Sequence, residues 1–304
     1  MTWQTQPFHT VSMPARQEVR RKRVVNIIFL LALGGAAIGL ASAGAASACD
    51  LMGFSFNKEV EAHELFGRFR ELSPRNRDGW GVGFYTDASP TVFKEPIPVA
   101  ESRLAEALIA NRMIRSKVFI LHLRAASIGK PSQRNTHPWV REVGGTEYTL
   151  AHVGGADKRL WQKVELGRFK PVGENCAEYL FCHIVGEIEK QGITAWDREA
   201  FDRLHRIVQA VNEVQTTSHL LSDGTHLFAY SSKRGTWLSY AQRTMPPAGA
   251  ASDAEPAAGF VVARNGQNLA EPGEQWTKIP PGHLVVFKEG KVVYRSEASK
   301  ETQP

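Results

Sequence analysis

Cysteine is scarce in this chain, with only Cys49, Cys176 and Cys182 among 304 residues. An odd and small number argues against a disulfide framework and leaves at least one thiol free or reactive. The sequence has no CxxC pair and no His/Cys cluster with the spacing of zinc ligands. We therefore expect no structural metal, and nothing in the sequence calls for a cofactor.

A large excess of positive charge is also missing from most of the chain. The formal net charge is +6, but residues 1–48 hold five of the 37 Lys and Arg and only one of the 31 Asp and Glu. The remaining 32 cations and 30 anions nearly balance. This composition gives no reason to expect a nucleic-acid partner.

Long apolar runs are rare, and the clearest one lies near the N-terminus at residues 24–45. It follows the basic residues 20–23 and ends before Ala46-Ser47-Ala48, which fits the A-x-A pattern of a signal peptidase site. We divide the chain accordingly into an export signal or membrane anchor, residues 1–48, and a domain, residues 49–304. Cleavage before Cys49 predicts an exported protein, periplasmic or extracellular.

Two other fates remain open for this leader. Its apolar run is about 22 residues long and roughly 20 suffice to span a bilayer, so an uncleaved leader would anchor the protein in the membrane. A cysteine directly after small residues is also where bacterial lipoproteins are cut and acylated, although Ala46 stands where such signals prefer a larger aliphatic residue. In each case the membrane is contacted only through the N-terminal segment.

The rest of the chain alternates strand and helix patterns without an internal repeat. Apolar or alternating runs predict strands at 51–56, 80–85, 91–93, 118–123, 148–152, 219–221, 226–230, 237–240, 259–263, 283–288 and 291–294. Apolar residues at helical spacing predict helices at 60–72, 102–115, 175–189 and 197–214. Residues 245–258 are rich in Ala, Pro and Gly and predict a mobile surface loop. The order indicates an α+β domain with layers of sheet and helix.

Cys49 is the first candidate for chemistry. If the leader is removed before it, the new α-amine titrates near pH ~8 and is close enough to take the thiol proton through a water. The thiolate is the nucleophilic form. The alternative is a small buried hydrophobic residue at the start of a strand.

A second group of candidates follows the predicted strand 118–123. Arg124 lies where this strand opens into a loop, and its planar guanidinium suits a carboxylate or a structural acid. Ser127 and His137 follow on the same long segment. A histidine before a proline, such as His137, is more often structural than catalytic.

Several short motifs occur in an order that resembles the class II glutamine amidotransferases, most of all their small stand-alone bacterial branch. The markers are Cys49–Gly53, Asp78–Gly81, His122–Gly129, Asn135–Trp139, Ala151-His152, Glu178, Leu221–Gly224 and Ile279–Gly282. The resemblance implies a four-layer α/β/β/α sandwich of the N-terminal nucleophile hydrolase type. It also implies hydrolysis of glutamine or a γ-glutamyl amide by an N-terminal cysteine.

The resemblance assigns roles to residues of this chain. Cys49 matches the nucleophile and base, Arg124 the clamp for the substrate α-carboxylate, and Gly154 the glycine whose N–H helps to form the oxyanion hole. Ser127 and His137 are placed with the substrate-binding residues.

Two positions depart from the family pattern. Val153 stands where the family has an asparagine that donates to the oxyanion, and losing such a donor typically costs about 10²–10³ in turnover. Cys176 stands where the family has an aspartate that binds the substrate α-amine, and we count it with the substrate-binding residues. We expect Cys176 to be an inert pocket residue, with a disulfide to Cys49 as the alternative in an oxidising compartment.

Three hypotheses follow. The first is an exported amidohydrolase that uses Cys49 on a glutamine-like or γ-glutamyl amide lacking a free α-amine. The second is a catalytically degenerate binding or regulatory module of the same fold. The third is a lipoprotein acylated at Cys49 or a protein tethered by its leader. Nothing after residue 287 is long enough for a synthase domain, so free hydrolysis or a separate ammonia-accepting enzyme is expected.

Overall fold

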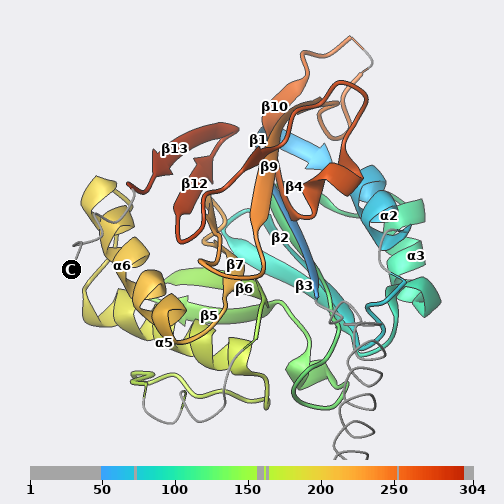
Figure 1. The fold of residues 1–304 in the computed structure, drawn as a ribbon. Helices are drawn as coiled ribbons and strands as arrows, with labels where there is room; N and C mark the ends of the chain where they lie inside the picture. Colours follow the sequence, from blue (N-terminus) through green and yellow to red (C-terminus); the bar gives the residue numbers. More distant parts are fainter. Residues whose placement is uncertain (1–48, 72–73, 156–160, 162–163, 252, 298–304) are drawn as a thin grey trace, which may run out of the picture. The chain divides into compact units, whose positions relative to one another are not determined.

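The computed structural model describes residues 49–297, apart from 72–73, 156–160, 162–163 and 252 (Figure 1). Two antiparallel sheets form its centre. The first has the strand order β11-β9-β10-β1-β4-β2-β3 and the second the order β13-β12-β8-β7-β6-β5.

The strands of the first sheet come from both ends of the described chain. They are β1 (Asp50–Glu61), β2 (Trp80–Thr86), β3 (Ser89–Glu95), β4 (Arg115–Leu123), β9 (Leu238–Met245), β10 (Ala257–Arg264) and β11 (Thr277–Lys278). Those of the second are β5 (Trp139–Val143), β6 (Thr146–Val153), β7 (Ser218–Ser222), β8 (His226–Tyr230), β12 (Leu284–Lys288) and β13 (Lys291–Arg295). Short 3₁₀ turns η1 (Val99–Glu101), η2 (Gln133–Asn135) and η3 (Gly266–Leu269) join some of them.

Helices cover the outer face of each sheet. α2 (His63–Glu71) and α3 (Arg103–Ala110) bury apolar residues against the first sheet, and α5 (Cys176–Lys190) and α6 (Arg198–Val214) against the second. Figure 1 shows the two helix pairs on opposite sides. A third apolar cluster fills the space between the sheets, with residues such as Leu51, Ile120 and Leu220. This is the predicted four-layer α/β/β/α sandwich.

Side chains along β1 point alternately to the two faces of the sheet, so that this strand packs against two layers. Met52, Phe54 and Phe56 face the helices α2 and α3, whereas Leu51 faces the second sheet. Gly53 is required on that inner face, because a Cβ there would lie 2.7 Å from Leu220 Cδ1 and 2.8 Å from the Phe119 carbonyl oxygen. The absence of a side chain at Gly53 therefore lets Leu220 of the second sheet pack against the backbone of β1.

Most predicted elements are present with shifted ends. The helix predicted from Val60 begins at His63, because β1 continues to Glu61 after a bulge and pairs with Arg115 and Ser116. The helix predicted to reach Arg115 ends at Ala110, which leaves Met113 57% exposed rather than buried.

Two other segments differ from the prediction. β5 (Trp139–Val143) is a strand in a range for which the sequence predicted no element. The loop predicted at 245–258 is shorter, because Met245 pairs with Ala257 across the hairpin of β9 and β10. Ser102 and Asp197 cap α3 and α6 by accepting from the N–H groups of Ala105 and Ala200.

The predicted leader, residues 1–48, lies outside the described residues. Within the part of the chain that is described, no helix combines the length and the apolar character needed to cross a bilayer.

Candidate functional site

Cys49 is the residue immediately before β1, at the edge of the layer between the two sheets. The pairing of Asp50 with Leu123 places it opposite the end of β4. The N–H of Ala125 donates to Cys49 Sγ at 3.3 Å, and Sγ lies 3.4 Å from the Ala125 carbonyl oxygen. The half-buried thiol is thus held against the first turn of the loop that follows β4.

The surroundings of this thiol favour its protonated form. Burial raises the pKa of Cys49 to about 11, and the Ala125 N–H and the Arg124 guanidinium offset that rise only in part. At neutral pH the sulfur therefore carries its proton. A nearby base is needed before it can act as a nucleophile.

Arg124 lies beside the thiol and is enclosed by backbone. Its Nη1 donates to the Asp78 carbonyl oxygen at 3.2 Å, and its Nη2 donates to those of Ile128 and Gly129 at 2.9 Å each. The side chain is fully buried, with 1% of the residue exposed. Backbone carbonyl groups therefore already occupy the hydrogen-bond donors that a substrate carboxylate would use.

Cys176 approaches the same guanidinium from the second sheet's helix layer. It is the first residue of α5, whose N-cap Asn175 accepts from the Ala177 N–H at 3.0 Å. Cys176 is 5% exposed, and its burial raises the pKa of its thiol while Arg124 lowers it. The fold therefore brings Arg124, Cys49 and Cys176 into one neighbourhood, and all three cysteines are free thiols.

A buried ion pair fixes the backbone that leads into α5. Glu178 has no exposed surface and accepts from Arg141 at 2.6 Å. Its two oxygens also accept from the N–H groups of Val172 and Gly173 at 2.9 and 2.7 Å. These charge-assisted bonds determine where Cys176 lies.

Gly154 follows β6 and has a backbone that excludes other residues. Its φ is +152°, and a Cβ would lie 2.2 Å from the Thr216 carbonyl oxygen. The preceding Val153 is 1% exposed and packs in the apolar cluster between the sheets. The side chain before Gly154 therefore offers no hydrogen-bond donor.

This arrangement can be compared with known proteins. The family model described as "Glutamine amidotransferases class-II" matches residues 48–304. The chain belongs to the class II glutamine amidotransferases.

Relatives of similar length lie in archaea and bacteria. An uncharacterised protein of Methanocaldococcus jannaschii is 34% identical over 262 residues, which cover 82% of this chain and 72% of that protein. The Escherichia coli protein with the name "Putative glutamine amidotransferase YafJ" is 28% identical over 263 residues, 81% of this chain and 99% of that one.

Solved structures share the fold. A "predicted glutamine amidotransferase" from Pseudomonas aeruginosa PA01 aligns with a TM-score of 0.57 at 24% identity, over 81% of this chain and all of that one. The glutamine phosphoribosylpyrophosphate amidotransferase of B. subtilis aligns with a TM-score of 0.59 at 16% identity, over 82% of this chain and 49% of that one. The class II fold is thus shared with enzymes of different size.

His137 of this class II amidotransferase belongs to a buried array of imidazoles. It is 2% exposed, its Nδ1 accepts from the His152 N–H at 3.2 Å, and its Nε2 lies 3.1 Å from Asn175 Nδ2. Its ring centroid is 3.9 Å from that of His122. Burial and the neighbouring histidines hold its pKa well below the usual range, so it is neutral. Its contact with substrate stays a prediction, and its observed contacts orient Asn175 beside Cys176.

Ser127 is exposed on the loop after Arg124, and its contact with substrate stays a prediction. Three residues of the site were not assigned a role from the sequence. Asp78 accepts from the Ala126 N–H at 2.7 Å, Asn135 accepts from the Glu174 N–H at 2.8 Å, and Arg264 donates to the Cys49 carbonyl oxygen at 3.2 Å. The first two fall inside motifs that mark the family, whereas nothing local marks Arg264.

A metal would need three or more clustered side chains of His, Cys, Asp or Glu. Among the described residues no such group has a suitable arrangement.

Proposed function

We propose that this class II glutamine amidotransferase family member is an exported amidohydrolase in which Cys49, freed by cleavage after Ala48, is the N-terminal nucleophile. The observation that carries the proposal is the position of Cys49 Sγ. It lies against the Ala125 backbone, in the neighbourhood of Arg124 and Cys176, at the start of the domain that matches the family.

The reaction balances with the groups of the mature chain. The α-amine of Cys49, acting through a water, takes the thiol proton, and Sγ attacks the amide carbonyl carbon. The C–N bond then breaks, the amine leaves with that proton, and a thioester remains on Cys49. Water attacks the thioester carbon, releases the acid and returns the proton to the sulfur.

The leader has a direct role in this proposal. While residues precede Cys49, its nitrogen is an amide and cannot accept the thiol proton, and the thiol pKa of about 11 leaves little thiolate at neutral pH. Cleavage after Ala48 supplies the base. Export and activation are then the same event.

The substrate is an amide whose acyl half has a carboxylate but lacks a free α-amine. Arg124 binds this carboxylate after the loop 125–129 releases its bonds to the guanidinium, and Ser127 on the same loop contacts the substrate beside it. Cys176 offers no negative charge to an α-ammonium at neutral pH, because burial raises its pKa. Gly154 supplies a backbone donor to the oxyanion without the aid of Val153, so we expect slow turnover. The ammonia or amine is released freely or passes to a separate enzyme.

The test is the intact mass and N-terminal sequence of the protein purified from cells that express the full chain, followed by hydrolysis assays. The expected result is a chain that begins at Cys49 with a free amine and hydrolyses N-acetylglutamine faster than glutamine. An acylated Cys49, or an intact leader on the active protein, contradicts the proposal. Cys182→Ala is the matched control for Cys49→Ala, because Cys182 is fully buried in another part of the fold.

A further inference from the structure

A cavity lies next to Arg264, the residue that contacts the backbone of Cys49. It has a volume of about 440 Å³ and lies between β9, β11 and the turn η3. Its walls include Trp237, Arg264, Gln267, Trp276 and Lys278. None of these residues belongs to the motifs that mark the family.

Two side chains at this cavity form hydrogen bonds with residues of the candidate site. Arg264 Nη1 donates to the Cys49 carbonyl oxygen at 3.2 Å and to Asp50 Oδ1 at 3.0 Å. Thr236, between the lining residues Gly235 and Trp237, donates from Oγ1 to the Val153 carbonyl oxygen at 3.4 Å, next to Gly154. One lining residue, Arg264, thus contacts the backbone of Cys49, and Thr236, which lies between two lining residues, contacts the backbone next to Gly154.

Sheet order separates the cavity from Arg124. β1 lies between β4 and β10 in the first sheet. Arg124 follows β4 on one side of Cys49, and Arg264 ends β10 on the other side. The two arginines therefore flank Cys49 from the two strands that pair with β1.

The cavity wall is cationic and aromatic. Lys278 is exposed and charged, and Arg264 is charged but forms an ion pair with Asp50 behind the wall. No Asp or Glu is among the lining residues, all of which the structure describes. Lys278 Nζ lies 3.9 Å from the centroid of the Trp237 ring, which is 43% exposed. This cation–π contact holds the exposed ammonium group of Lys278 beside the indole, where it can pair with an anionic group of a planar ligand.

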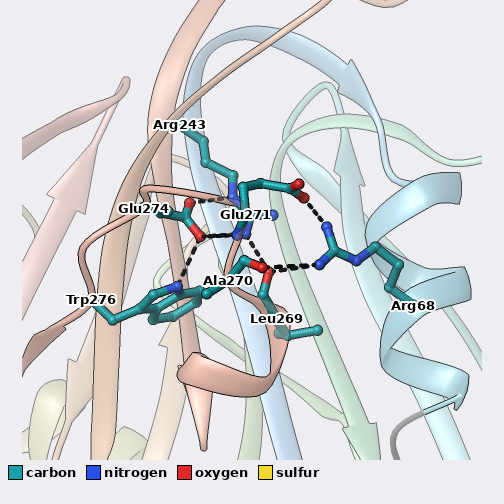
Figure 2. A network of polar contacts seen from close by, with 7 residues as sticks. All are labelled: Arg68, Arg243, Leu269, Ala270, Glu271, Glu274 and Trp276. Atoms are coloured by element: carbon teal, nitrogen blue, oxygen red, sulfur yellow. Dashed lines mark hydrogen bonds and ion pairs between the residues drawn. The ribbon is translucent and has the colours of Figure 1, made fainter.

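A polar network holds the second tryptophan rigid, as Figure 2 shows. Trp276 Nε1 donates to Glu274 Oε2 at 2.8 Å, and Arg243 binds both Glu274 oxygens at 2.5 and 2.7 Å. The Trp276 ring lies directly on Gly266, where a Cβ would be 2.1 Å from the ring. The ring is fixed without occupying the cavity, as a preformed wall requires.

The same network fastens η3 to helix α2. Arg68 pairs with Glu271 and donates from Nη2 to the Leu269 carbonyl oxygen at 3.1 Å, and Arg243 Nη2 donates to that carbonyl at 2.7 Å. The Glu271 N–H donates to Glu274 Oε2 at 3.1 Å, which joins the two parts of the network. Three segments far apart in the chain, at Arg68, at Arg243 and at residues 269–276, therefore meet at one side of the cavity (Figure 2).

We propose that this cavity is a binding subsite for the amine half of the substrate, and that this half is a planar or aromatic group that carries a carboxylate. Lys278 and Arg264 bind the carboxylate, and Trp237 and Trp276 contact the planar group. The catalytic part of this assignment rests on the proposed function, whereas the binding of an aromatic anion does not.

The test uses calorimetry on the purified full chain with two probes that differ only by a carboxylate, 5-amino-2-nitrobenzoate and 4-nitroaniline. We expect the carboxylated amine to bind about tenfold more tightly. Lys278→Ala lowers that preference about fivefold, Lys278→Arg retains most of it, and Trp237→Ala weakens both probes. Lys117→Ala, which removes an exposed lysine from a separate cavity, is the control and leaves both affinities unchanged. Equal binding of the probes, or equal effects of Lys278→Ala and Lys117→Ala, overturns the proposal.

Activity assays separate this proposal from the catalytic one. The matched substrates are the N-acetyl-γ-glutamyl amides of the same two amines. Binding that depends on Lys278 in a protein that cleaves neither amide supports the anion site and overturns only the hydrolase assignment. Cleavage of both amides at equal kcat/KM, unchanged in Lys278→Ala, overturns the subsite and leaves the hydrolase assignment intact.

Discussion

Arg264 donates to the carbonyl oxygen of Cys49 at 3.2 Å across a separation of 215 positions in the chain. The same Nη1 reaches Asp50 Oδ1 at 3.0 Å, so one guanidinium fixes the first two residues of the domain. The C-terminal half of the chain thereby helps to position Cys49, the proposed nucleophile. Strand β10 supplies this contact because it pairs with β1.

Replacing Arg264 with methionine tests that dependence. We expect a loss of about 1 kcal/mol in the free energy of unfolding, because two partly buried hydrogen bonds disappear. The kcat/KM for amide hydrolysis is expected to fall about tenfold, since misplacement of a reacting group slows the chemistry. Arg295→Met, at a residue that bonds Tyr240 instead, is the control. Unchanged kcat/KM in Arg264→Met contradicts the account.

Cys176→Asp tests the recognition of the α-amine. Aspartate is favourable at the first turn of α5, and it would place a negative charge in the neighbourhood of Arg124. We expect the KM for glutamine, which has a free α-amine, to fall about fivefold to tenfold relative to the KM for N-acetylglutamine. Steady-state kinetics with both amides measure this ratio. Cys176→Ser is the control, and an equal ratio in both variants counts against the assignment.

Glu178→Gln tests the anchor of the loop before α5. Gln keeps the size of Glu178 but removes the charge that pairs with Arg141, and the guanidinium is then left without its counter-charge in a poorly solvated place. We expect a loss of about 3 kcal/mol in the free energy of unfolding, measured by urea denaturation. Glu189→Gln, which breaks an exposed pair with Arg168, is expected to have no measurable effect. Similar unfolding midpoints for the two variants would refute this role.

The buried histidines predict a pH dependence of stability. Burial lowers the pKa of His122 and His219 to about 3 and that of His152 to about 4. The unfolded chain binds protons near pH 6.5 and the folded chain does not, so stability falls as the pH drops below about 6.5. Each histidine contributes a loss of about 1 kcal/mol between pH 7 and pH 5.5.

Urea denaturation at the two pH values measures this loss. Most carboxylates stay ionised over this interval, so the histidines dominate the change. His219→Gln keeps a polar side chain beside Tyr230 but does not titrate, and its loss is expected to be smaller by the share of one histidine. A wild-type free energy of unfolding that is constant from pH 7 to 5.5 is the contrary result.

Local patterns were enough for much of the fold. The apolar run 118–123 gave β4, the spacing of Phe201, Leu204 and Val208 gave α6, and both are present. Element ends were less predictable, because they depend on partners. β1 extends through polar residues to Glu61 only because Arg115 and Ser116 pair with it.

The candidate site also contains residues with a local sequence signal and residues that only tertiary contacts bring into place. Arg124 lies in a motif of the family and Cys176 lies two residues before the marker Glu178, and the structure brings Arg124 near both Cys176 and Cys49. Arg264, Trp237 and Lys278 have no local signal, because each acts through a contact with residues distant in the chain or across a hairpin. The sequence predicts groups that belong to a motif, whereas a cavity wall made by tertiary pairing has to be seen in the fold.

The measurement that tests the central claim most directly compares two forms of the domain, one beginning at Cys49 and one beginning at Ala48. Both contain the same thiol, but only the first has an α-amine on Cys49. Hydrolysis of N-acetylglutamine and alkylation of Cys49 by iodoacetamide are followed from pH 6 to 10. The account predicts hydrolysis by the first form alone. It also predicts that Cys49 is alkylated faster in the first form near pH 8. In the second form the alkylation rate is expected to rise about tenfold per pH unit, as it does for a thiol with a pKa of about 11. Equal rates in the two forms would contradict the claim that Cys49 is an N-terminal nucleophile.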